Sequence, residues 1–145
     1  MFKKLVLGVT SLAIASAVGL GFSSEASAAP APPLTSVKIV KVESQFGGVE
    51  FINSNSLSTS QHHGGSYLYV YTRDMGYGSN PGAQMNGGFL KKVGSTPIDV
   101  NGDRTIDGWE YKWDASVYQS GGQFQYKNRS TNAPWNTLST SLNIR

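Results

Sequence analysis

Short stretches of alternating side chains, separated by glycine-rich turns, constrain the fold of this chain more than any other feature. The stretches at residues 36–42, 67–71 and 106–113 are rich in β-branched and aromatic residues, and the last two alternate with a period of two. A period of two is that of a β-strand, whose successive side chains point to opposite faces. No window carries the i, i+3, i+4, i+7 stripe of an amphipathic helix. The pattern therefore predicts an all-β fold.

Strands at this spacing are typical of a single antiparallel β-sandwich or a small barrel of about six to seven strands. We predict strands at residues 36–42, 49–52, 67–71, 89–93, 106–113, 123–126 and 138–144. The stretch 67–71 is expected to be a central strand because its composition fits a buried, pleated surface. Region 76–88 holds five glycines and Pro81, so we expect a loop there, and we expect Gly94 and Pro97 to end the strand at 89–93.

The N-terminus has the three parts of a secretory signal peptide. Lys3 and Lys4 form a positive region, residues 5–22 are mostly apolar, and residues 26–28 offer the small side chains that signal peptidase requires. A membrane anchor is the alternative, since a run of 18 mostly apolar residues approaches the roughly 20 that span a bilayer. Polar residues within the run, and the prolines after it, favour cleavage after Ala28.

The sequence thus predicts a signal peptide at 1–28, a proline-rich extended leader at 29–35 and a single β domain at 36–145. We expect a secreted, extracellular monomer without stable membrane insertion.

Composition excludes several classes of function. The chain has no cysteine, which excludes disulfide frameworks and thiol catalysis. Its 12 Lys and Arg residues against 9 Asp and Glu residues give a formal charge of +3. Few basic residues lie beside aromatic ones, whereas a nucleic-acid surface interleaves the two, so we expect no nucleic-acid partner.

Acidic residues gather in one window. Five of the nine carboxylates lie within residues 99–114, together with two basic residues. Calcium prefers six to eight oxygen ligands, which a twelve-residue loop supplies from positions 1, 3, 5, 7, 9 and 12. The corresponding residues are Asp99, Asn101, Asp103, Thr105, Asp107 and Glu110. This segment resembles the calcium loops of EF-hand and dockerin modules, and the resemblance implies a calcium site.

Two departures weaken the calcium interpretation. Position 6, usually glycine, is Arg104, and Gly94 and Pro97 leave no room for an entering helix. The alternative is a plain polar turn, because Asp, Asn, Gly and Thr are common in β-turns. Repulsion among clustered carboxylates without a counterion favours the metal slightly.

The two histidines are adjacent, at His62 and His63. Neighbouring side chains on an extended segment point opposite ways, which disfavours a joint zinc site, and a solvated loop is the alternative. The turn at residues 63–65 is similar to the oxyanion-hole turn of esterases, but no Gly-x-Ser-x-Gly motif accompanies it.

Two aromatic stripes permit two interpretations. The stripes are Tyr67, Tyr69 and Tyr71, and Trp109, Tyr111 and Trp113. Either could be an inward-facing core or a flat platform for sugar rings, and the core is the more frequent outcome in a small domain. Trp135, in a polar loop, is expected to be exposed. The candidate ligand-binding residues are Trp135, Tyr77 and His63.

Four stretches carry a family resemblance: residues 32–36 (PPLTS), 63–70 (HGGSYLYV), 76–89 (GYGSNPGAQMNGGF) and 138–145 (LSTSLNIR). With them the chain resembles the small YolA-type secreted proteins of Bacillus and related bacteria, a family whose domain has no known function. The resemblance implies secretion by a Gram-positive bacterium and carries over no catalytic residue.

Together these features predict a secreted binding protein rather than an enzyme, with cell-envelope polysaccharide as its ligand and calcium as a candidate stabilising ion. The alternative is a secreted toxin or antimicrobial factor, which the basic balance outside the acidic window suggests. A hydrolase is third. Its paired carboxylates could come from Glu43, Glu50, Asp74 or Glu110.

Overall fold

The computed structural model describes residues 30–145, so the predicted signal peptide lies outside the described residues. The described part contains nine strands and no helix, and thus no helix long and apolar enough to cross a membrane. The strands are β1 (Ser36–Ser44), β2 (Gly48–Phe51), β3 (Leu68–Met75), β4 (Gly82–Met85), β5 (Gly88–Phe89), β6 (Lys91–Ile98), β7 (Gly108–Asp114), β8 (Gly122–Arg129) and β9 (Thr137–Ile144).

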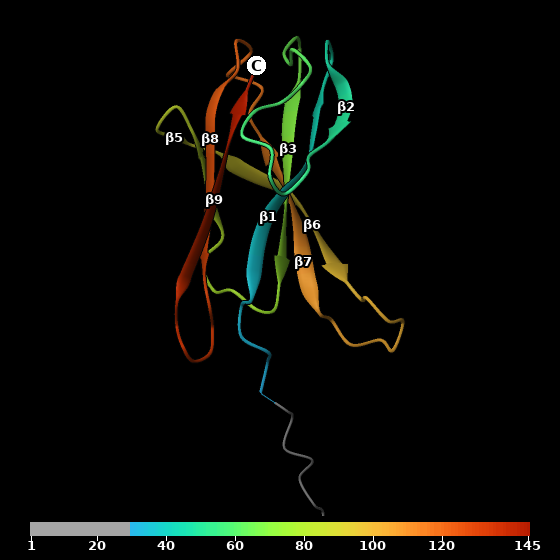
Figure 1. Cartoon of the computed structure of the whole chain (residues 1–145), viewed down its shortest axis with the longest axis vertical. Helices are drawn as coiled ribbons and strands as arrows, with labels where there is room; N and C mark the ends of the chain where they lie inside the picture. The colour runs from blue at the N-terminus through green and yellow to red at the C-terminus, as the bar shows by residue number, and fades with distance from the viewer. Residues whose placement is uncertain (1–29) are drawn as a thin grey trace, which may run out of the picture.

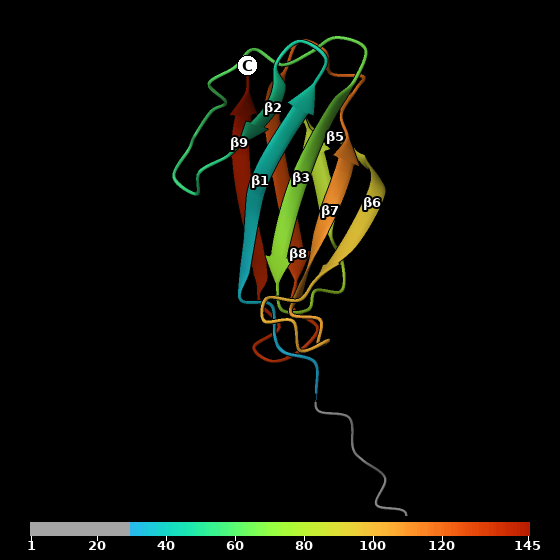
Figure 2. The same cartoon turned by 90° about the vertical axis from the view of Figure 1, so that its right-hand side faces the viewer.

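The strands form two antiparallel sheets packed face to face, as Figures 1 and 2 show. One sheet has the order β2-β1-β3-β7-β6 and the other the order β5-β4-β8-β9. The two sheets do not close into a barrel. The all-β prediction is confirmed, and of the two predicted architectures the sandwich is the one observed.

The core lies between the sheets. The five-stranded sheet contributes Val42, Leu68, Val70, Tyr111 and Trp113, and the four-stranded sheet contributes Ala83, Met85, Phe124, Tyr126, Leu142 and Ile144. Strand β3 is central, as predicted, with buried side chains at alternate positions. Removal of this apolar surface from water is the main favourable term in the folding of such a domain.

Two strand predictions were wrong, and both errors concern glycine and proline. β4 lies inside the region expected to be a loop, because Gly82 is accommodated within the strand and Gly87 belongs to a tight turn. β6 continues past Gly94 and Pro97 to Ile98. As an edge strand it tolerates a proline that cannot donate a hydrogen bond. β4, and the division of the predicted strand at 89–93 into β5 and β6, explain why nine strands are present instead of six or seven.

Candidate functional site

The outer face of the four-stranded sheet is built from alternate residues of β8 and β9. Along β8, Phe124, Tyr126 and Asn128 are buried and face the core. The alternate side chains of the two strands point outward: Gln123, Gln125, Lys127, Arg129, Thr137, Ser139, Ser141 and Asn143. This face therefore consists of amides and hydroxyls with two positive charges.

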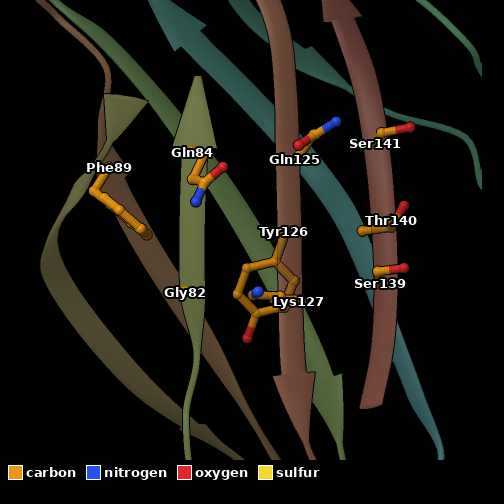
Figure 3. A pocket seen from close by; sticks show the side chains of 9 residues that line it. All are labelled: Gly82, Gln84, Phe89, Gln125, Tyr126, Lys127, Ser139, Thr140 and Ser141. Atoms are coloured by element: carbon orange, nitrogen blue, oxygen red, sulfur yellow. The ribbon is translucent and has the colours of Figure 1, made fainter. Parts of the chain in front are cut away.

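A groove of about 390 Å³ lies on this face (Figure 3). It is lined by Gly82, Gln84, Phe89, Gln125, Tyr126, Lys127, Ser139, Thr140 and Ser141. One cross-strand row joins Phe89, Gln84, Gln125 and Ser141, and the neighbouring row joins Gly82, Lys127 and Ser139. The register of four strands thus brings together residues that lie far apart in the sequence.

Phe89 provides the apolar surface of the groove. Its side chain is 83% exposed, although phenylalanine usually packs inside a domain. A two-residue turn places it there: Asn86 and Gly87 both have positive φ, as a type I′ hairpin requires, and Met85 pairs with Gly88. A Cβ on Gly88 would lie 1.8 Å from the Tyr118 hydroxyl oxygen, so a larger residue there would require the Tyr118 side chain to move.

Gly82 and Lys127 lie opposite each other in the groove. A Cβ built on Gly82 would meet no atom within 4 Å, so the missing side chain leaves open space above β4. Lys127 is the charged member of the lining, and among the residues that the structure describes it forms no ion pair. The groove therefore offers neutral hydrogen-bonding groups with one unpaired ammonium.

A buried polar network lies on the inner side of β8. Tyr126 Oη donates a 2.7 Å hydrogen bond to Asp74 Oδ2, and Asn128 Nδ2 donates a 2.6 Å bond to the same oxygen. Burial raises the pKa of Asp74, although the two hydrogen bonds oppose this effect. Asn128 Oδ1 accepts hydrogen bonds from the backbone N–H of Asn80 and Arg129. This network ties β8, which carries much of the groove, to the central strand β3.

His63, one of the predicted ligand-binding residues, is buried, and its N–H donates a hydrogen bond to the carbonyl of the C-terminal residue Arg145. Its Nδ1 lies 2.9 Å from Ser44 Oγ and its Nε2 lies 3.1 Å from Glu50 Oε2. Glu50 also accepts hydrogen bonds from the N–H groups of Ser60 and Gln61. His62, in contrast, is exposed. The alternative of a solvated loop therefore holds for His62 and not for His63.

The Ser44, His63 and Glu50 side chains have the residue types of a hydrolase triad, but their setting is that of a packing contact. The Ser44 side chain is fully buried and its Oγ accepts the Gly47 N–H. Space around the ring is filled, because a Cβ on Gly47 would lie 2.4 Å from His63 Nδ1. A nucleophile must reach its substrate, and this hydroxyl is enclosed. The cluster therefore fixes the β1–β2 hairpin against the loop that follows it.

The acidic loop is organised by hydrogen bonds to its own backbone. Asp99 accepts hydrogen bonds from the N–H groups of Gly102 and Arg104, and Asp103 accepts one from Thr105. Asp107 Oδ2 accepts the N–H of Val100. Arg104 has a φ of 69°, the left-handed conformation for which calcium loops use glycine. These carboxylates therefore accept hydrogen bonds from backbone N–H groups of the loop itself.

Glu110 does not join this loop. It lies on β7, where its Oε2 is 2.8 Å from Arg73 Nη2 in an ion pair across to β3. Among the described residues, no three acidic, histidine or cysteine side chains are grouped so that they could hold a metal ion. The arrangement thus differs from the predicted ligand set of Asp99, Asn101, Asp103, Thr105, Asp107 and Glu110, and calcium binding stays a prediction.

Trp135 and Tyr77 lie near one end of the sandwich. Trp135 is 55% exposed in the loop between β8 and β9, as predicted. Tyr77 follows β3, and its hydroxyl donates a hydrogen bond to the Ile106 carbonyl. The backbone of Thr131, in the loop of Trp135, bonds to the Tyr77 carbonyl. The structure therefore brings these two segments together and leaves His63 apart from them.

The structure separates the two aromatic stripes. Tyr111 and Trp113 are buried, and Trp109 packs against the core. Tyr67, Tyr69 and Tyr71 lie on the opposite face of the sheet, only partly buried. The Lys41 and Lys112 ammonium groups each lie 3.9 Å from a ring centroid, over Tyr71 and Tyr69 respectively. Lysines thus occupy ring faces that a sugar would need, which makes this stripe a poorer sugar platform than the groove.

Sequence reasoning missed the groove residues. Gln84, Gln125, Lys127, Ser139 and Ser141 are ordinary surface residues when each is considered by itself. The available signal was the polar alternation within 123–129 and 137–143, which marks the outward face of two paired strands.

Comparison with known proteins gives a family but no activity. A family model described as "Domain of unknown function (DUF4879)" matches residues 29–144. No curated protein matches the chain. The chemistry of the molecule must therefore be inferred from its own geometry.

Proposed function

Because the chain belongs to the DUF4879 family, whose function is unknown, we propose a function from the groove: the protein binds a polysaccharide of the cell envelope. The observation that carries this proposal is the pairing of an exposed Phe89 ring with a row of neutral amides and hydroxyls. Sugars present the matching chemistry, since their hydroxyls both donate and accept hydrogen bonds and their ring faces are apolar.

The polarity of the groove supports a sugar over a lipid or an apolar ligand. Gln84 and Gln125 each offer a donor and an acceptor, and Ser139 and Ser141 offer hydroxyls that can do either. Binding sites for small molecules commonly combine apolar surface with a few placed polar groups. Lys127 adds one positive charge, which suits a chain that carries occasional phosphate or carboxylate groups.

Secretion is part of the same proposal. The resemblance to YolA-type proteins implies it, and the family match begins at residue 29, directly after the predicted cleavage site. A secreted protein of a Gram-positive bacterium meets the polysaccharides of the cell envelope first. Sequencing the N-terminus of the protein recovered from culture medium tests this step, with Ala29 expected as the first residue.

Filling the groove is the direct test of binding. Gly82→Tyr should place a ring in the open space without backbone strain, because Gly82 lacks a positive φ and meets no neighbour. The matched control is Thr96→Tyr, which adds the same ring on the exposed edge strand β6 of the other sheet. We expect Gly82→Tyr to abolish retention on purified Gram-positive cell-wall polysaccharide and Thr96→Tyr to retain it.

The same assay can overturn the proposal. Equal retention of Gly82→Tyr and Thr96→Tyr would show that the groove is not the binding site. Absence of retention of the unmodified protein, together with growth inhibition or vesicle leakage, would favour the toxin alternative.

A further inference from the structure

Trp135 occupies a backbone conformation that its own side chain disfavours. Its φ is 60°, in the left-handed region that glycine and asparagine adopt most readily. Among the described residues, Asn86 and Arg104 are the other non-glycine residues with positive φ, and asparagine is a common choice for such a position. A bulky aromatic residue in this conformation calls for a separate reason.

Packing does not provide that reason. The Trp135 side chain is 55% exposed, whereas Trp113 is 3% exposed in the core. The hydrogen bonds of Trp135 use only its backbone: its N–H donates to the Asn132 carbonyl, and its carbonyl accepts Arg129 Nε. An asparagine could make the same backbone contacts. The indole ring therefore makes no hydrogen bond among the described residues and is more than half exposed.

The loop that holds Trp135 directly follows β8 and is tied to it through Arg129. Arg129 points outward on β8, two and four residues along from the outward Lys127 and Gln125 that line the groove. Its guanidinium reaches the Trp135 carbonyl at 3.2 Å. Four residues of β-strand extend about 13 Å, so Arg129 lies about 13 Å along β8 from Gln125, and the Trp135 backbone is held by its side chain.

We infer that Trp135 is a second sugar-stacking position, so that the ligand is an extended polysaccharide chain running from Phe89 along β8 and β9 to Trp135. This inference rests on the proposed function of the groove. It narrows the ligand class, because a monosaccharide or disaccharide in the groove cannot also reach the indole ring. The outward Arg129 and Thr137 pair lies between the two positions and offers hydrogen-bond partners along the way.

The test uses Trp135→Asn in the mature protein and a size-fractionated partial hydrolysate of Gram-positive cell-wall polysaccharide. Asparagine tolerates positive φ, so the melting temperature should be unchanged or higher. Affinity for the longest fractions should fall roughly tenfold, the size of one aromatic contact, while affinity for the shortest fractions stays the same. Trp135→Phe, which retains a ring, should keep most of the affinity for long chains.

Fluorescence gives a second readout. Trp109 and Trp113 belong to the core region, so collisional quenching by acrylamide reports mainly on Trp135. Long fractions should protect the unmodified protein from quenching, and short fractions should not.

Two outcomes overturn the inference, and they are distinguishable. If short fractions bind and Trp135→Asn binds every length as the unmodified protein does, the second position is wrong and the groove stands. If no fraction binds, or if Gly82→Tyr leaves binding intact, the groove proposal fails and the extension fails with it.

Discussion

Tyr126 Oη donates a hydrogen bond of 2.7 Å to Asp74 Oδ2 across the interior of the sandwich. The bond joins β8 of the four-stranded sheet to β3 of the five-stranded sheet. Both residues are 1% exposed, so the contact is shielded from solvent. It therefore couples the strand that carries the groove to the centre of the opposite sheet.

Loss of the Tyr126 hydroxyl should be costly. Tyr126→Phe removes the donor and leaves the Asp74 carboxyl with Asn128 alone. A hydrogen bond to a charged group contributes about 1.5–3 kcal/mol, so we expect the free energy of unfolding to fall by about 2 kcal/mol at neutral pH. Chemical denaturation measures this change. Tyr69→Phe on the outer sheet face is the control, and an equal loss there would contradict the assignment.

The stability of the protein should depend on pH through Asp74. Burial raises its folded-state pKa above 3.8, so the folded state holds the proton more tightly than the unfolded state. The stability that protonated Asp74 contributes is therefore fully present below pH 3.8 and is lost as the pH rises through the folded-state pKa.

Asp74→Asn removes this titration. We expect the melting temperature of the variant to improve relative to the unmodified protein as pH is raised from about 4 to 8. Melts across this range measure the difference. A difference in melting temperature between the two proteins that is the same at every pH would show that the Asp74 carboxyl has the same pKa in the folded and unfolded states.

How far the sequence predicts the structure differs between the fold and the site. The all-β class, the centrality of β3 and the exposure of Trp135 follow from local patterns, since alternation and turn residues act over a few positions. The two aromatic stripes alternate equally well. Which one faces inward depends on which sheet face is covered, and no local pattern records that. The groove depends on the register of β4, β8 and β9, which Gly82, Gln125 and Ser141 do not reveal individually.

Glu50 should contribute stability with the opposite pH dependence from Asp74. Burial raises its pKa, but hydrogen bonds from Ser60, Gln61 and His63 outweigh burial and leave the pKa below 4.5. The stability that ionised Glu50 contributes is thus present above pH 4.5 and is lost as the pH falls through the lowered folded-state pKa. Glu50→Gln should cost about 1 kcal/mol at pH 7 and progressively less in acid. Denaturant titrations at several pH values check this, and a loss that grows in acid would refute it.

Asp99 should stabilise its loop without any metal. Asp99→Ala removes the acceptor of the Gly102 and Arg104 N–H groups, so we expect a melting temperature lower by a few degrees in excess chelator. The same comparison in millimolar calcium tests the ion predicted from the sequence. A larger loss in calcium than in chelator would show that the carboxylate also holds the ion, since bound ligand adds stability to the folded state.

Lys127 should decide which polysaccharides the groove prefers. Its ammonium has no carboxylate partner among the described residues, so an anionic group on a ligand can pair with it directly. Lys127→Gln keeps a hydrogen-bonding side chain and removes the charge. We expect affinity for a phosphate-bearing wall polymer to fall several-fold and to depend less on salt, because ionic attraction at an exposed site is screened. Affinity for a neutral polysaccharide should stay the same, and isothermal titration at two salt concentrations distinguishes the cases. An equal fall for both polymers would mean that Lys127 acts through the shape of the groove rather than through its charge.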